Sequence, residues 1–144
     1  MGGIINYIKA EIVIEEKDIN KKIRIINSFE EIKREEKRPD GEDDYKYENE
    51  KEIKKCKIII NEKIISFSYF YIFKEKGKYF IKYSFTDNIT KINYMFFECN
   101  SLINIDLSNF NTQNVTDMSC MFFGCKTLKK DNIITENEII LNNF

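Results

Sequence analysis

The chain has 144 residues, 42% of them hydrophobic and 14% aromatic, so it can bury a core and does not have the composition of a disordered segment. Its 23 basic and 24 acidic residues give a net charge of -1, which provides no general attraction to nucleic acid or to an anionic membrane. No apolar run reaches the roughly 18 to 20 residues that a membrane-spanning helix needs.

The chain begins with elements that sequence pattern predicts clearly. Residues 4–14 alternate an apolar face with a more polar one, which is typical of a half-buried strand, and residues 23–28 predict a second strand. A short helix is expected over residues 29–38, because Asn27 or Ser28 can cap its first turn and the only proline of the chain follows it.

Charged residues of both signs dominate residues 30–55. This composition favours a solvated, mobile insertion between strands. The alternative is an acidic loop that docks a partner. Its carboxylates would be Asp40, Glu42, Asp43 and Asp44.

Residues 56–85 predict further short strands. The run KIIINEKIISF reads as two strands joined by a tight turn at residues 61–63, and SYFYIF as another. Gly77 stands where a hairpin turn would need a positive φ, and the alternation that starts at Tyr79 predicts one more strand. The phrase EKGKYFIKYSF is loosely similar to the late strands of immunoglobulin-like or PKD-like modules. We therefore expect residues 1–87 to form a small antiparallel β-sandwich, with a ubiquitin-like β-grasp as the alternative.

Residues 88–134 contain an internal repeat with a period of 26 residues. Seven positions recur unchanged: Asn88, Thr90, Met95, Phe96, Phe97, Cys99 and Leu102 return as Asn114, Thr116, Met121, Phe122, Phe123, Cys125 and Leu128. The period lies within the range of leucine-rich repeats. Leu102, Ile105 and Leu107 have the spacing of a repeat strand, whereas the apolar residues within 92–96 and 118–122 have helical spacing.

The run LSNFNTQNVTDMSCMFFGCKTL resembles the BspA-type leucine-rich repeats, also called the surface-protein 26-residue repeat. The resemblance covers about a third of the chain. It implies a short solenoid that serves protein contacts or display, without chemistry of its own. The predicted fold is therefore mainly β with a minor α component, a small antiparallel sandwich followed by a short, truncated leucine-rich-repeat-like solenoid.

The second copy is degenerate beyond Leu128, where the pattern L-S-N-F-N-T is lost. Residues 88–144 are thus expected to hold two repeats and to end in a degenerate strand or hairpin, whereas solenoids usually need about three repeats. The expected strand residues are Ile133, Ile134, Ile139, Ile140 and Leu141. Alternatively, the last repeat edge is completed by further repeats or by another subunit, which allows self-association.

No chemistry-bearing motif stands out. The chain has no histidine, and its four cysteines include no C-x-x-C pair, so we expect neither a metal site nor a cofactor nor catalytic residues. Cys99 and Cys125 occupy the same repeat position, and are expected to be buried structural thiols. A disulfide between them would need an oxidising compartment, whereas no secretory signal is seen and a cytoplasmic location is expected, with the cell surface as the alternative.

These observations predict a non-enzymatic protein–protein interaction or scaffold module. Its partner would be a protein rather than nucleic acid, and no membrane span is expected. The variable strand positions of the repeats are the candidate partner contacts. They are Asn104, Asp106, Ser108, Lys129, Lys130 and Asn132. The alternatives are a display or adhesion-type surface protein and a subunit that completes a larger repeat assembly.

Overall fold

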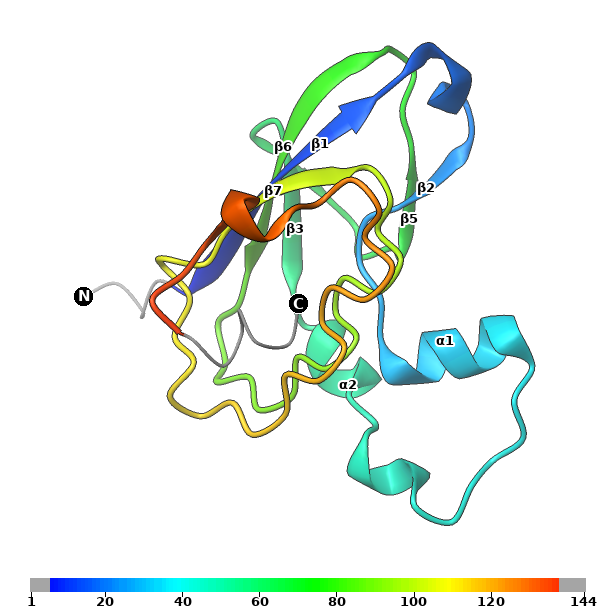
Figure 1. The fold of residues 1–144 in the computed structure, drawn as a ribbon, viewed down its shortest axis with the longest axis vertical. Coiled ribbons are helices and arrows are strands. Elements are labelled where there is room, and N and C mark those ends of the chain that lie inside the picture. Colours follow the sequence, from blue (N-terminus) through cyan, green and yellow to red (C-terminus); the bar gives the residue numbers. More distant parts are fainter. Residues whose placement is uncertain (1–5, 138–144) are drawn as a thin grey trace.

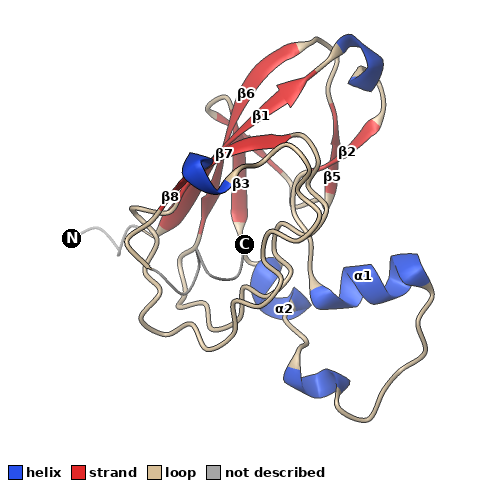
Figure 2. Ribbon diagram, in the orientation of Figure 1, coloured by secondary structure: helices blue, strands red, loops and turns tan. Residues whose placement is uncertain are grey.

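A computed structural model describes residues 6–137 and shows a mainly β protein, as the sequence predicts (Figures 1 and 2). Its main element is a six-stranded mixed sheet with the order β4-β3-β6-β1-β7-β8, beside a two-stranded ribbon of β2 and β5. The strands are β1 (Tyr7–Ile14), β2 (Lys22–Arg24), β3 (Lys57–Ile60), β4 (Lys63–Ile65), β5 (Phe70–Ile72), β6 (Gly77–Ser84), β7 (Leu102–Asp106) and β8 (Ile133–Ile134). The helices are α1 (Phe29–Glu36) and α2 (Glu50–Ile53), with short 3₁₀ turns η1 (Glu16–Asp18), η2 (Asp44–Lys46) and η3 (Lys130–Asn132).

Strand β1 lies inside the sheet, antiparallel to both β6 and β7. Its alternation is confirmed: Ile8, Ala10, Ile12 and Ile14 are buried in the core, whereas the residues between them face the other side. Residues 4 and 5 of the predicted strand lie outside the described residues. Because β7 belongs to the first repeat, one sheet joins the parts of the chain before and after residue 88.

Local turn chemistry sets the hairpin of β3 and β4. Asn61 and Glu62 have φ angles of 45° and 68°, the conformation of a two-residue hairpin turn, and the predicted turn is confirmed. Gly77 has the expected positive φ of 141°. The hairpin expected there does not form, however, because β5 pairs with β2, whereas β6 lies between β1 and β3.

Helix α1 begins as predicted, with the Ser28 hydroxyl accepting a hydrogen bond from the amide of Glu31 at 3.2 Å. It ends at Lys37, whose φ of 54° stops the helix two residues before the proline. Figure 1 shows α1 beside the sheet rather than across it, so the β-grasp alternative is wrong.

The charged insertion is more ordered than its composition suggests. Ile53 and Asn49 are buried, and the ammonium of Lys33 lies between the carboxylates of Asp40 and Asp44 at 2.7 and 2.5 Å. Most side chains of the insertion are exposed, as expected, but its second half also packs on the first repeat through Asn49 and Glu52.

The repeats contain strands but not the helices that their apolar spacing suggested. The described residues 88–101 and 114–127 form successive tight turns instead. Left-handed backbone at Tyr94, Glu98, Cys120 and Gly124, with φ between 53° and 78°, interrupts any helix there. The left-handed positions recur with the sequence repeat, because Cys120 and Gly124 lie 26 positions after Tyr94 and Glu98.

The two copies lie side by side in register. The amides of residues 92, 94, 96 and 98 donate to the carbonyls of residues 117, 119, 121 and 123 at 2.8–3.0 Å. The rings of Phe96 and Phe122 stack with centroids 5.8 Å apart, and β7 and β8 pair in parallel. Ile139, Ile140 and Leu141 of the predicted terminal strand lie outside the described residues, whereas Ile133 and Ile134 do form β8.

Both Cys99 and Cys125 are buried free thiols, as predicted, and the Cys125 thiol donates to the carbonyl of Phe96 at 2.9 Å. Within residues 6–137, no helix has the length and apolar character needed to cross a membrane.

Candidate functional site

One face of the six-stranded sheet packs on the core, and the other faces solvent. Residues that pair across neighbouring strands point to the same side, so the register defines this second face, which we call the open face. Its central residues are Ile64 on β4, Ile59 on β3, Phe80 and Lys82 on β6, Lys9 and Glu11 on β1, Asn104 and Asp106 on β7, and Ile134 on β8.

Large apolar side chains are exposed on the open face. Ile64, Phe80 and Ile134 are 62%, 60% and 58% accessible to solvent, and they lie on three different strands. Single exposed apolar residues are ordinary on protein surfaces, but several on one sheet face indicate an interaction surface. The open face can therefore bury apolar side chains of another molecule.

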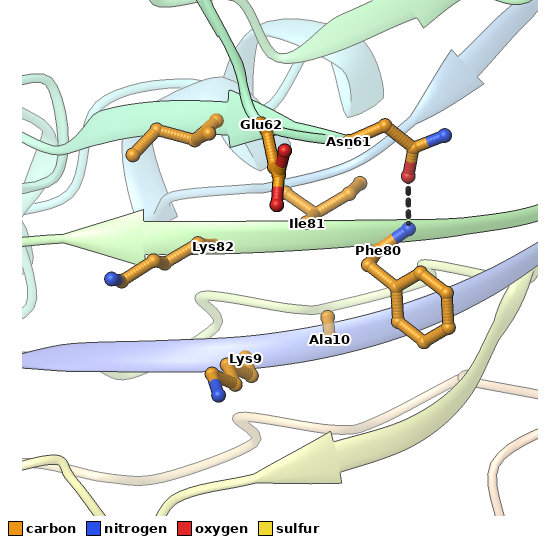
Figure 3. Close-up of a pocket in the computed structure, with 8 residues that line it drawn as sticks. Lys9, Ala10, Asn61, Glu62, Phe80, Ile81 and Lys82 are labelled. Carbon is orange, nitrogen blue, oxygen red and sulfur yellow. Dashed lines mark hydrogen bonds between the residues drawn. The ribbon is translucent and has the colours of Figure 1, made fainter.

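A hollow of about 570 Å³ lies on the open face next to Phe80, and we call it the basic hollow (Figure 3). Its lining residues are Lys9, Ala10, Ile59, Asn61, Glu62, Phe80, Ile81 and Lys82. The Asn61 side-chain carbonyl accepts a hydrogen bond from the amide of Phe80 at 2.9 Å, which fixes the hairpin turn beside the hollow. Two lysines and one carboxylate give this hollow a positive balance.

A second hollow, of about 430 Å³, lies toward β7 and β8 and shares Lys9, Ala10 and Phe80 with the first. We call it the acidic hollow, because Glu11, Asp106 and Asp131 line it against one lysine. The two hollows make the open face basic on the β6 side and acidic on the β7 side.

A chain of polar contacts orders the acidic hollow. Lys78 pairs with Glu11 at 3.0 Å, the amide of Asn104 also donates to Glu11, and Asn132 donates to Asn104 at 2.7 Å. Burial opposes ionisation of Glu11, but the contacts from Lys78 and Asn104 outweigh it and lower the pKa of this carboxyl. Glu11 is thus held charged between strands from both parts of the chain.

The structure brings together three of the six candidate contact residues. Asn104, Asp106 and Asn132 line the acidic hollow. Ser108 lies just beyond β7, where its hydroxyl donates to Asp106 at 2.6 Å. Hydrogen bonds from the hydroxyl and the amide of Ser108 lower the pKa of Asp106, and burial opposes this effect only in part.

Lys129 and Lys130 are exposed at the start of η3 and line neither hollow. Lys9, Phe80 and Lys82 were not predicted as site residues, and they come from strands outside the repeats. The alternation along β1 and β6 was available as a signal for all three, because it sets them opposite to the buried Ile8, Ile81 and Tyr83.

The described residues hold no group of three or more histidine, cysteine or acidic side chains placed to bind a metal ion. What the open face offers is contact chemistry, namely apolar surface and fixed charges of both signs.

Neither the curated proteins nor the solved structures with which the chain was compared give a match. A family model does match: that of a Mycoplasma protein of unknown function, DUF285, over residues 60–138. This match covers more than half of the chain, from the β3–β4 turn through both repeats, and the chain therefore belongs to the DUF285 family.

Proposed function

We propose that the chain is a non-enzymatic protein-interaction or scaffold module, built on two short BspA-like leucine-rich repeats, and that its open face binds the partner. The observation that carries this proposal is the exposure of Ile64, Phe80 and Ile134 on one sheet face. Apolar surface of this kind costs free energy while it faces water, at about 25 cal/mol per Å². Contact with a partner would recover that free energy.

The contacts between the two copies support a solenoid-like arrangement. Besides the backbone ladder, Phe97 and Phe123 stack with centroids 5.4 Å apart, and the hydroxyl of Thr127 donates to the carbonyl of Leu102 at 2.7 Å. Phe97 and Phe123 occupy the same position of the two copies, so equivalent side chains stack on each other, as they do in stacked repeats.

The charged insertion supports the same interpretation, because it covers the side of the first copy that faces away from the second copy. Glu52 accepts hydrogen bonds from the amide and the hydroxyl of Thr90 at 2.8–2.9 Å. The side chain of Asn93 donates to the carbonyl of Tyr47 at 2.9 Å, and Lys91 donates to the carbonyl of Lys46 at 2.7 Å. In the second copy, the amide and hydroxyl of Thr116 donate to the carbonyl of Thr90 in the first copy. The equivalent groups of Thr90, which a preceding repeat would have satisfied, are bonded to the insertion, and this is the role of a cap.

The test is capture of a protein by the immobilised chain, with wild type compared to a Phe80→Ser and Ile134→Ser double variant. A Tyr45→Ser variant is the matched control, because Tyr45 is 66% exposed but does not belong to the open face. We expect wild type and control to retain the same protein and the double variant to lose it by about tenfold or more. Equal retention by all three would contradict a binding role for the open face.

A second function, a subunit that completes a larger repeat assembly, is favoured by the far edge of the second copy. Among residues 6–137, the amides of Met118, Cys120 and Gly124 have no hydrogen-bond acceptor, and Phe123 is 62% exposed. Such donors are spaced to pair with the carbonyls of a third copy, as the first copy pairs with the second. Light scattering over a dilution series tests this function, which predicts a molar mass that grows with concentration.

A further inference from the structure

We propose that the basic hollow takes a protein segment in which an acidic side chain and a large apolar side chain lie two residues apart. This inference rests on the proposed function, because it names the chemistry of the partner that the open face binds.

The two lysines of the basic hollow have no ion-pair partner in the described part of the chain. Lys9 and Lys82 lie directly opposite each other on β1 and β6. On its other side Lys9 lies opposite Asp106 of β7, which is too far away for an ion pair. The Glu62 carboxylate, which lines the same hollow, is also not within ion-pair distance of either lysine. Like charges directly opposite on a sheet destabilise it. A bound carboxylate would relieve this repulsion.

The ammonium groups of Lys9 and Lys82 both lie near the aromatic ring of Tyr7. The Nζ atoms of Lys82 and Lys9 lie 4.1 and 5.7 Å from the centroid of the Tyr7 ring. The electrons of the ring partly compensate the two positive charges, but they do not neutralise them. The arrangement therefore presents two positive charges to one carboxylate.

The apolar part of the hollow lies at a fixed distance from these charges. Figure 3 shows the two lysines at one end and the ring of Phe80 at the other, with Ala10 and Ile81 between them. Lys82 and Phe80 are two residues apart on β6, which is about 7 Å along a strand. Side chains on one face of an extended segment repeat with the same spacing. An acidic residue and an apolar residue two positions apart would therefore meet the lysines and Phe80 together.

A protein segment fits better than nucleic acid. Glu62 lines the hollow, Glu11 and Asp106 follow on the next two strands, and the net charge of the chain is -1. A polyanion would meet these carboxylates as it extended beyond the two lysines. A single carboxylate beside an apolar group would not.

The experiment is a titration of the full chain, labelled with ¹⁵N, with capped eight-residue peptides followed by amide chemical shifts. The first peptide alternates threonine with glutamate and phenylalanine, so that the latter two share one face. The second replaces glutamate by lysine, and the third places glutamate and phenylalanine next to each other. We expect the first peptide alone to shift the amides of residues 9–11, 59–62 and 80–82, and about 0.5 M salt to weaken the effect.

The variants reverse the charge of the hollow. Lys9→Glu with Lys82→Glu should abolish binding of the glutamate peptide and favour the lysine peptide. The matched control, Lys21→Glu with Lys76→Glu, changes two exposed lysines that do not line the hollow and should leave binding unchanged.

Equal shifts with the glutamate and lysine peptides, shifts confined to other strands, or no shift at millimolar peptide would overturn the proposal. Stronger shifts of the same amides by a short deoxythymidine oligonucleotide would overturn it in favour of nucleic acid. If the Phe80→Ser and Ile134→Ser variant loses a captured protein while charge reversal has no effect, only this inference fails, and the proposed function stands.

Discussion

Glu98 and Gly124 occupy the same position of the two copies, and both adopt a left-handed backbone, with φ of 58° and 78°. The two residues also touch, because a Cβ added to Gly124 would lie 2.8 Å from Cγ of Glu98. The repeat therefore requires a turn that only glycine makes without strain, and only one copy has the glycine.

Replacing Gly124 by alanine should lower the free energy of unfolding by about 1–2 kcal/mol, from backbone strain and the contact with Glu98. Adding Glu98→Gly removes the contact but not the strain at position 124, so the double variant should recover part of the loss. Urea denaturation of the wild type, the two single variants and the double variant separates the backbone strain at position 124 from the contact with Glu98. Purely additive effects would contradict the contact.

Asn49 connects the insertion to the first repeat. Its side chain accepts from the amide of Phe29 at 3.0 Å and donates to the backbone carbonyl of Asn93 at 2.7 Å. We expect Asn49→Ala to cost about 2–4 kcal/mol, because it leaves buried polar groups without partners. The neighbouring exposed Glu48→Ala is the control. Urea denaturation measures the loss in free energy of unfolding, and faster hydrogen exchange in residues 91–97 should accompany this loss. A loss equal to that of the control variant would show that the Asn49 contacts do not stabilise the fold.

The strands of the sheet were predictable because their pattern is local. Alternation along β1 and β6 records that one face meets the core and the other meets water, and the two-residue turn at Asn61 has a local signature. The pairing of β1 with β7 was not predictable. It joins residues about 95 positions apart, and alternation says that a segment is a strand without saying which strand is its neighbour.

The repeat predicted its register correctly but its local structure incorrectly. Residues 92, 95 and 96 have helical spacing because they point into the core, yet a series of tight turns directs them inward equally well. The left-handed residues that decide between the two structures are Tyr94 and Glu98 in the first copy, and neither type favours that conformation. Only Gly124 carried a visible signal.

Only part of the candidate site could be predicted, because sequence pattern is local and does not give the order of strands. Asn104, Asp106 and Asn132 follow from the alternation and position of the repeat strands, whereas only the order of strands in the sheet sets Lys9 beside them.

Thiol reactivity should separate Cys120 from the other cysteines. Burial raises the pKa of Cys56 and of Cys125 to about 12, and it also raises the pKa of Cys99, whereas Cys120 is only partly buried. A thiol with so high a pKa carries about a thousandfold less thiolate at pH 8 than an ordinary cysteine. We expect one thiol to react rapidly with a disulfide reagent in the native chain and four in urea. Rapid reaction that persists in Cys120→Ser would contradict this assignment.

The contact between α1 and α2 predicts a stability that depends on pH. Hydrogen bonding from Arg34 outweighs burial and, together with a bond from Tyr69, lowers the pKa of Glu50. A carboxylate whose pKa is lowered by folding stabilises the fold above its unfolded pKa of about 4.3, and this contribution is lost as the pH falls through the folded value.

Glu50→Gln should therefore reduce the free energy of unfolding by about 1–2 kcal/mol at pH 7. The difference from wild type should shrink as the pH is lowered from about 4.3 toward 3, because the wild-type side chain then also becomes neutral. Tyr69→Phe keeps the ring and removes the bonds of the hydroxyl to Glu50 and to Ser28. Only the part of its loss that comes from Glu50 should shrink as the pH falls. Urea denaturation from pH 7 to pH 3 measures all three proteins. A difference that stays constant over this range would mean that Glu50 stabilises the contact by packing and not by its charge.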